Sequence, residues 1–289
     1  YKTLKKEYNH YDSWELYNLL SDHYNNTAHK PFEHLICDEV QDFSNVELRL
    51  MRSLVREKPN DLFLVGDPFQ SIYDRKINFS KAGINIRGKR SRKLKVNYRT
   101  TEEIKRHAIA VVKGEKFNQF DEDEVDNLDG YVSLIRGKQP SYQVFKNLSL
   151  EGEHIVDIIK KHTSDESDVY IAPENICIAA RTNKRVDNLI SLLYEHNIDV
   201  WTISEDRTKK QGIRVSTFHN LKGMEFKVVI LTDLSEETFP FLPYAVKTGD
   251  DYTKARHIKS EKALLYVAMS RAVQFLYLTG VGEKHLILE

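Results

Sequence analysis

Short apolar runs alternate with longer amphipathic stretches along almost the whole chain. The short runs have the length and residue types of strands, and the long stretches have the periodicity of helices. Predicted strands occupy residues 34–37, 62–65, 131–135, 176–180, 200–203, 213–217, 228–231 and 275–279. Predicted helices occupy residues 13–24, 45–57, 101–112, 153–162, 183–196 and 261–272, with Ser44 and Thr100 as candidate N-caps. This alternation is typical of parallel sheets with helices on both faces, so we predict an α/β fold.

The composition excludes some classes of function. Lys and Arg total 43 and Asp and Glu total 43, so the chain has no global field that would attract nucleic acid or an anionic membrane. No apolar run reaches the length of a membrane span, and we therefore expect a cytoplasmic protein with no membrane partner. Cys37 and Cys177 lie far apart in the sequence without a Cys-x-x-Cys pair, so we assign them no metal or disulfide chemistry.

The segment from Arg75 to Arg99 is locally basic. It contains ten Lys or Arg residues and no acidic residue. One interpretation is a solvated loop, and the other is a surface that contacts the phosphate backbone of a nucleic acid.

Two adjacent carboxylates, Asp38 and Glu39, follow the first predicted strand. In isolation such a pair is a common polar strand end. At the carboxyl end of a parallel strand, however, one carboxylate can hold a hydrated Mg²⁺ while the other accepts a proton from water. The second strand leads through Gly66 and Asp67 to Gln70, whose amide can bond both a phosphate oxygen and the attacking water. Together these features point to nucleotide hydrolysis.

Asp38-Glu39-Val40-Gln41-Asp42 and the box from Leu62 to Tyr73 resemble, in this order, motifs II and III of UvrD/Rep-like superfamily-1 DNA helicases. Residues 96–101 look like motif IV, residues 217–226 like motif V, and residues 266–272 like motif VI. The resemblance covers about residues 30 to 280 and implies RecA-like domains of the P-loop NTPase type that close on ATP and Mg²⁺.

The resemblance also implies roles for individual residues at the nucleotide. Asp38 matches the Mg²⁺ ligand, Glu39 the residue that activates water, and Gln70 the residue that couples the nucleotide to DNA. Arg99 and Arg271 match two arginines that reach the γ-phosphate, and Glu225 matches the glutamate at the ribose. A planar, permanently charged guanidinium suits a phosphoryl group that gains charge, although each arginine by itself is equally a surface ion-pair residue.

A second set of matching residues faces single-stranded DNA in the family. Thr217, His219 and Asn220 occupy the corresponding part of motif V, and Tyr73 ends the motif III box. After Tyr73 the family usually has Gly-Trp-Arg-Gly, whereas this chain has Asp-Arg-Lys-Ile, so Arg75 would have to replace the Trp ring by guanidinium stacking. A structural histidine and a buried tyrosine are the alternative interpretations of His219 and Tyr73.

Two further departures concern whole segments. The interval between motifs IV and V is used by the second RecA-like domain itself, so a large accessory insertion looks absent. No Gly-x-x-x-x-Gly-Lys-Ser/Thr box occurs in the 289 residues, although such a loop cradles the nucleotide phosphates. We therefore expect the C-terminal half of a first RecA-like domain at residues 1–95 and a complete second domain at residues 96–289.

The leading hypothesis is a fragment of an ATP-dependent DNA helicase or translocase, 3′-to-5′ by family, which hydrolyses ATP negligibly on its own. The expected partners are single-stranded or partly duplex DNA, with other DNA repair or defence proteins as candidates. Alternatives are a non-catalytic nucleic-acid-binding or regulatory module and the helicase part of an ATP-dependent nuclease. The residues alone do not distinguish DNA from RNA.

Overall fold

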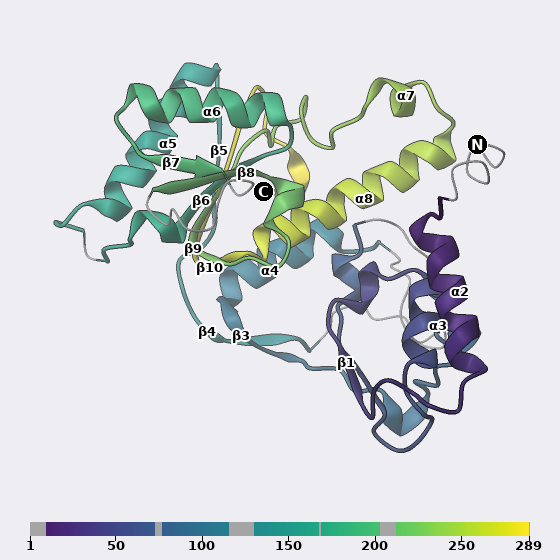
Figure 1. Ribbon diagram of the computed structural model, residues 1–289. Helices are drawn as coiled ribbons and strands as arrows, with labels where there is room; N and C mark the ends of the chain where they lie inside the picture. The colour runs from purple at the N-terminus through teal and green to yellow at the C-terminus, as the bar shows by residue number, and fades with distance from the viewer. Residues whose placement is uncertain (1–9, 73–76, 116–129, 168, 203–211, 289) are drawn as a thin grey trace. The chain divides into compact units, whose positions relative to one another are not determined.

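The chain divides into two compact units. The computed structural model describes residues 10–72, 77–115, 130–167, 169–202 and 212–288 (Figure 1). One unit is built from the described residues up to Lys93, and the other from Leu94–Glu115 and the described residues from 130 onward. The assignment of residues 1–95 and 96–289 to two RecA-like domains stays a prediction.

The first unit contains a two-stranded parallel sheet flanked by helices. Strand β1 pairs with β2 so that Leu35, Ile36 and Cys37 lie opposite Leu62, Phe63 and Leu64. Ser44 begins α3 with a capping box, because its side chain accepts from the Glu47 N–H and the Glu47 carboxylate accepts from the Ser44 N–H. This confirms the Ser44 prediction. The elements are α2 (Ser13–Asn25), β1 (Leu35–Cys37), η1 (Val40–Asp42), α3 (Asn45–Ser53), β2 (Leu62–Leu64), η2 (Pro68–Gln70), η3 (Ser80–Ala82) and η4 (Gly88–Arg90).

The second unit is organised around a six-stranded, wholly parallel sheet in the order β5-β10-β9-β6-β8-β7. The central strand β6 is buried along its whole length, which explains its unbroken apolar sequence. The strands of this sheet are β5 (Ser141–Phe145), β6 (Ile176–Ala180), β7 (Val200–Thr202), β8 (Ile213–Thr217), β9 (Phe226–Leu231) and β10 (Ala272–Val281).

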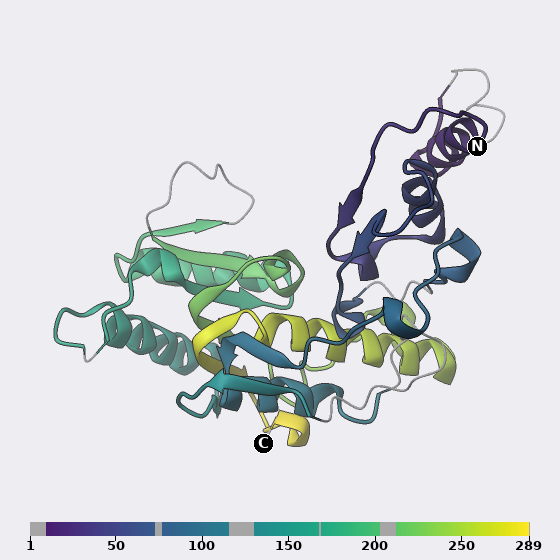
Figure 2. The ribbon, with the colours of Figure 1, turned by 90° about the horizontal axis from the view of Figure 1, so that it is seen from below.

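Helices cover both faces of this sheet. Helices α5 and α6 pack on one face, and α8 with α4 on the other (Figures 1 and 2). The α/β class with parallel strands and helices on both faces, as in RecA-like domains, is therefore confirmed. The remaining elements of this unit are β3 (Val96–Thr101), α4 (Glu102–Val112), β4 (Val132–Ile135), α5 (Leu148–Thr163), η5 (Pro173–Asn175), α6 (Asn183–Glu195), η6 (Phe218–Leu221), α7 (Tyr244–Lys247), α8 (Asp251–Met269) and η7 (Leu286–Leu288).

Several boundaries differ from the sequence prediction for identifiable reasons. Thr101, not Thr100, caps α4, because its hydroxyl accepts from the Ile104 N–H. Helix α8 begins at Asp251 instead of 261, because the Asp250 carboxylate caps a first half that is too polar to show a periodic apolar face. Strand β5 was not predicted, because its alternating polar sequence becomes a strand only by pairing with β10 at the sheet edge.

Among the described helices, none combines the length and the apolar character needed to cross a bilayer.

Candidate nucleotide and nucleic-acid sites

The paired carboxylates of the first unit lie in a strained turn where β1 ends. Glu39 has a φ of 55°, a left-handed conformation that is uncommon outside Gly and Asn. Its N–H donates to Asp38 Oδ1 at 2.7 Å, and its own carboxylate accepts from the Gln41 amide. The Asp38 side chain is exposed and Glu39 is half-buried. This turn therefore presents the first carboxylate to solvent while a neighbour fixes the second.

Gln41 connects the ends of the two parallel strands. Its side chain is buried, and its Oε1 accepts from the Asp67 N–H at 3.0 Å. Gly66 makes room for this contact, since a Cβ there would lie 2.5 Å from Gln41 Oε1. Asp67 in turn accepts from the Gln70 Nε2 at 3.0 Å, which orients that amide. Parallel pairing thus brings Asp38, Glu39 and Gln70 to one edge of the sheet. Sequence reasoning quoted Gln41 in its box but gave it no role.

In the second unit, Arg99 and Glu225 form an ion pair. The Arg99 Nε lies 2.7 Å from Glu225 Oε2, and both side chains are more than half exposed. Strand β3 supplies the arginine, and the segment that leads into β9 supplies the glutamate. The structure therefore brings together two residues that are distant in the sequence and that share a predicted nucleotide role.

Arg271 lies close to this pair but is oriented differently. It follows the C-terminus of α8 and is 3% exposed. Its Nε donates to the Val267 carbonyl at 3.0 Å, and its Nη1 lies 3.4 Å from the carbonyl of Met224, the residue before Glu225. Its Nη2 donates to Ser270 Oγ at 3.0 Å. The guanidinium therefore faces protein acceptors in this structure and not the solvent from which a nucleotide would bind.

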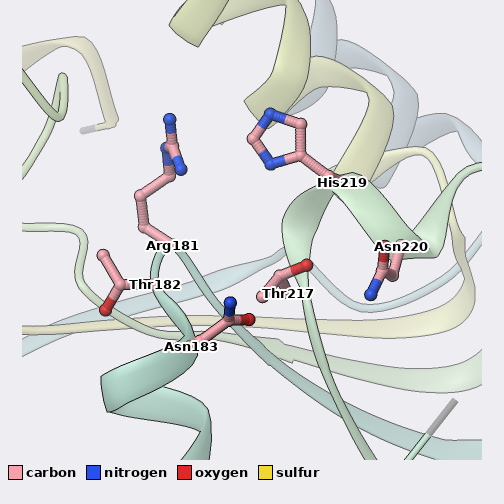
Figure 3. A pocket seen from close by; sticks show the side chains of 6 residues that line it. All are labelled: Arg181, Thr182, Asn183, Thr217, His219 and Asn220. Carbon is pink, nitrogen blue, oxygen red and sulfur yellow. The ribbon is translucent and has the colours of Figure 1, made fainter. Parts of the chain in front are cut away.

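A polar pocket of about 330 Å³ opens where two neighbouring strands of the sheet end (Figure 3). One wall comes from the end of β6 and the start of α6, where the Thr182 hydroxyl caps the helix by accepting from the Arg185 N–H. The other wall comes from the end of β8 and from η6. The lining residues are Arg181, Thr182, Asn183, Thr217, His219 and Asn220. Hydroxyls, amides, an imidazole and a helix N-terminus together suit a phosphate-bearing ligand.

Arg181 is held in the pocket wall by an ion pair. Its Nε and Nη2 lie 2.8 and 2.6 Å from the two oxygens of Glu261, a residue of α8 that is almost fully buried. The guanidinium also lies over the Phe241 ring, 4.8 Å from its centroid. Burial, together with the positive charge of Arg181, lowers the pKa of His219, so the imidazole is neutral near pH 7. The pocket therefore carries less positive charge than its residue types suggest.

A second buried ion pair stabilises the backbone of this pocket wall. Arg185 contacts the Glu151 carboxylate and lies 3.4 Å from Asp233. The other oxygen of Asp233 accepts from the Arg181 N–H at 3.1 Å. Burial raises the pKa of both Glu151 and Asp233, and the arginine opposes that effect. The backbone at the end of β6 is thus fixed by side chains from α5, α6 and the segment after β9.

Two family models match the sequence. One is described as the UvrD/REP helicase N-terminal domain and matches residues 1–90, and the other is described as the UvrD-like helicase C-terminal domain and matches residues 202–282. The chain belongs to the UvrD/Rep helicase family. Two separate segments of this UvrD/Rep-like chain are thus matched independently, in the order that the motifs indicated.

Individual relatives of this UvrD/Rep-like chain are much longer than the chain. The ATP-dependent DNA helicase PcrA of Staphylococcus epidermidis is 27% identical over 178 residues, which is 61% of this chain and 21% of that protein. A probable DNA helicase of Mycoplasma pneumoniae is 26% identical over 255 residues, 86% of this chain and 44% of that protein. The solved C-terminal domain of a possible DNA helicase from Lactobacillus is 20% identical, with a TM-score of 0.47, over 66% of this chain and 92% of that one.

The structure brings some of the predicted UvrD/Rep-like site residues together and does not describe others. Thr217, His219 and Asn220 line one pocket together. Tyr73 and Arg75 lie outside the described residues. Sequence reasoning missed Arg181, Thr182 and Asn183, which form the second wall. The available signal was their position, because they follow an apolar strand and begin a helix, as the recognised sites also do.

Proposed function

We propose that this chain is the part of an ATP-dependent DNA helicase or translocase that carries motifs II to VI and contacts single-stranded DNA through the polar pocket. The observation that carries the proposal is the convergence of two strand ends and a helix N-terminus on that pocket. Thr217 and Asn220 would bind phosphate oxygens, and neutral His219 would bind or stack without adding charge. The 3′-to-5′ direction and the preference for DNA over RNA rest on the family resemblance.

The nucleotide side of the proposal uses the first unit and the Arg99–Glu225 pair. Mg²⁺ usually takes only one or two protein carboxylates and completes its shell with water and phosphate oxygens, so exposed Asp38 is a fitting donor. When bound, the ion would neutralise charge on the nucleotide phosphates. Glu39, held by Gln41, would accept the proton of the attacking water, and Gln70 would orient that water. Arg99 would approach the γ-phosphate and Glu225 the ribose.

One observation favours a second candidate, a non-catalytic nucleic-acid-binding module. Arg271 is buried against backbone carbonyls and does not face solvent. In that case the pocket would bind DNA in the same way, but nucleotide would not be turned over. Both candidates predict that the 289-residue chain alone hydrolyses ATP negligibly, and DNA-stimulated turnover by the pure chain would contradict both.

The pocket is tested by fluorescence anisotropy with a short labelled oligo-dT. Replacing Thr217 and Asn220 together by Ala should weaken binding at least tenfold, because two phosphate contacts are lost. Because Thr217 and Asn220 carry no charge, the slope of log K against log salt should stay the same in the double variant. Thr248→Ala, an exposed threonine just after α7, is the matched control and should leave binding unchanged. Equal affinities for the double variant and this control would refute the DNA role of the pocket.

Nucleotide binding is tested separately with a fluorescent ATP analogue and Mg²⁺. Arg99→Ala should weaken binding, while Arg106→Ala, an exposed arginine on α4 that pairs with Glu102, serves as the control. An Arg99→Ala variant that binds as the control does would remove this residue from the proposed nucleotide site. Restored turnover after addition of a polypeptide with the missing phosphate loop would favour the motor over the non-catalytic module.

A further inference from the structure

The β3–β4 ribbon of the second unit exposes an apolar face. Val96 lies opposite Val132 in the parallel register, and residues two positions apart in a strand point to the same side. Tyr98 is 72% exposed and Leu134 is 64% exposed, and Leu94, just before β3, is 84% exposed. We call these five residues, Leu94, Val96, Tyr98, Val132 and Leu134, the ribbon face.

The opposite side of the same ribbon is polar and buried. Ser133 lies opposite Asn97, and its hydroxyl donates to the Thr100 carbonyl at 2.5 Å. Its N–H donates to the buried carboxylate of Glu102, which also pairs with Lys105. The ribbon is thus inverted relative to a normal half-buried sheet, where apolar residues face the core. On its polar side both the N–H and the hydroxyl of Ser133 are hydrogen-bonded inside the protein, whereas Val132 and Leu134 on the other side of β4 are exposed.

The surroundings of the ribbon face are basic. Residues 90–101 and 130–140 contain no Asp or Glu. The cationic side chains of these segments that belong to the second unit are all exposed, namely Lys95, Arg99, Arg136 and Lys138. Arg99 is paired with Glu225, and Arg136 lies 3.8 Å from Glu103, so Lys95 and Lys138 supply the net positive charge. An apolar patch with a charged rim is the usual anatomy of a protein interaction surface.

We propose that the ribbon face docks an acidic amphipathic helix of a partner protein. Four of its five residues are aliphatic, and a nucleic acid offers no aliphatic surface to match them, whereas Tyr98 alone would suit a base. The uncovered face of a parallel sheet is normally closed by a helix. Charge complementarity to the rim requires that this helix carry Asp or Glu beside its apolar stripe.

The test uses the full 289-residue chain and a labelled synthetic helix with Leu at positions i, i+3, i+4 and i+7 and Glu elsewhere. Binding is followed by anisotropy. There are two control peptides. One has the same composition in scrambled order, and the other has Lys in place of every Glu. The acidic amphipathic peptide should bind at least tenfold more tightly than either control. Equal binding of the Glu and Lys peptides, or of the scrambled one, would overturn the proposal.

Variants of the chain locate the contact. Leu134→Asp should weaken peptide binding at least tenfold, and Lys95→Glu should weaken it less and mainly at low salt. Leu148→Asp changes an exposed leucine of α5 and is the matched control. Circular dichroism and Trp201 emission verify that each variant is folded. Unchanged binding to Leu134→Asp would place the peptide elsewhere and refute the proposal.

Other occupants give distinct results, each of which would also overturn it. Competition by oligo-dT that depends on Leu134 would indicate a nucleic acid, and a dimer in sedimentation that Leu134→Asp disperses would indicate a second copy. The sequence from Asp121 to Asp129 is acidic. If the peptide binds only after the acidic residues between Asp121 and Asp129 are replaced by Asn and Gln, this acidic segment of the chain itself covers the ribbon face.

Discussion

The ion pair between Arg181 and Glu261 allows a stability prediction with a defined magnitude. Glu261→Gln removes the negative charge but keeps the size of the side chain, so the guanidinium loses its counter-charge and one of two close contacts. Removing one partner of a buried pair costs roughly 3–5 kcal/mol. The Arg181 side chain is 16% exposed and lines the open polar pocket, so we expect the lower end, about 3 kcal/mol.

The free energy of unfolding must be measured for the second unit alone, because a chain with two units need not unfold in a single step. The chain has two tryptophans, Trp14 in the first unit and Trp201 in the second. In a Trp14→Phe background, urea unfolding followed by Trp201 emission therefore isolates the relevant transition. Glu115→Gln is the control, since its partner Lys262 and Glu115 itself are both more than a fifth exposed and their pair should contribute less than about 1 kcal/mol.

The double variant Arg181→Met with Glu261→Leu distinguishes a charge effect from a packing effect. It removes both charges together, and Met can still pack on the Phe241 ring, so its stability should lie within about 1 kcal/mol of the parent. A Glu261→Gln variant no less stable than Glu115→Gln would refute the reasoning. A double variant as unstable as Glu261→Gln would show that shape, not charge, matters at this site.

Three further predictions concern other parts of the chain. Gly66→Ala should destabilise the first unit by about 1–3 kcal/mol, because the added Cβ would lie 2.7 Å from Val40 Cγ2 and would also clash with Gln41. Urea unfolding followed by Trp14 emission measures this loss of stability. An unchanged unfolding midpoint would contradict the prediction. Burial opposes ionisation of Glu102, but hydrogen bonds from Lys105, the Ser133 N–H and Arg106 lower the pKa of this carboxyl to about 2 from 4.5. Because the pKa of Glu102 is lower in the folded state than in the unfolded chain, its ionised carboxylate contributes about 3 kcal/mol to the free energy of unfolding above pH 4.5, and this contribution is lost as pH falls toward 2. Glu102→Gln should therefore flatten the pH dependence of stability between those pH values, measured by urea unfolding with Trp201 emission. An equally steep pH dependence in the variant would contradict the assignment. Because burial lowers the pKa of His219, the imidazole should not change charge between about pH 7 and pH 8. The affinity for oligo-dT should therefore change equally little over this range in the native chain and in His219→Gln. A change seen only in the native chain would show that the imidazole is charged.

The sequence anticipated the parts of the structure that depend on local patterns. The strands that end at Cys37 and Leu64 were recognisable as apolar runs followed by polar turns, and Ser44 with Glu47 is a local capping box. Strand β5 was not recognisable, because its side chains are only half-buried and its identity depends on β10, which lies far along the chain. The start of α8 was missed for a related reason, since its first turns have no continuous apolar face.

The candidate site divides in the same way. Sequence motifs identified Thr217, His219 and Asn220, but the opposite pocket wall depends on which strand lies beside β8 in the sheet, and that neighbour is set by tertiary packing. The orientation of Arg271 was equally inaccessible. Its motif indicates a residue type and a position, whereas its burial results from the way α8 ends against the Met224 carbonyl.

The segment from Thr217 to Glu225 links the two candidate sites through its own backbone. Its first residues line the pocket, the carbonyl of Met224 accepts from Arg271, and Glu225 pairs with Arg99. Phe218 and Leu221 are fully buried between these points, so the segment is anchored in the core and is not a freely moving loop. The Met224 carbonyl and the Val267 carbonyl both accept from Arg271, so this one segment of nine residues contacts the pocket at its start and the Arg271 guanidinium near its end.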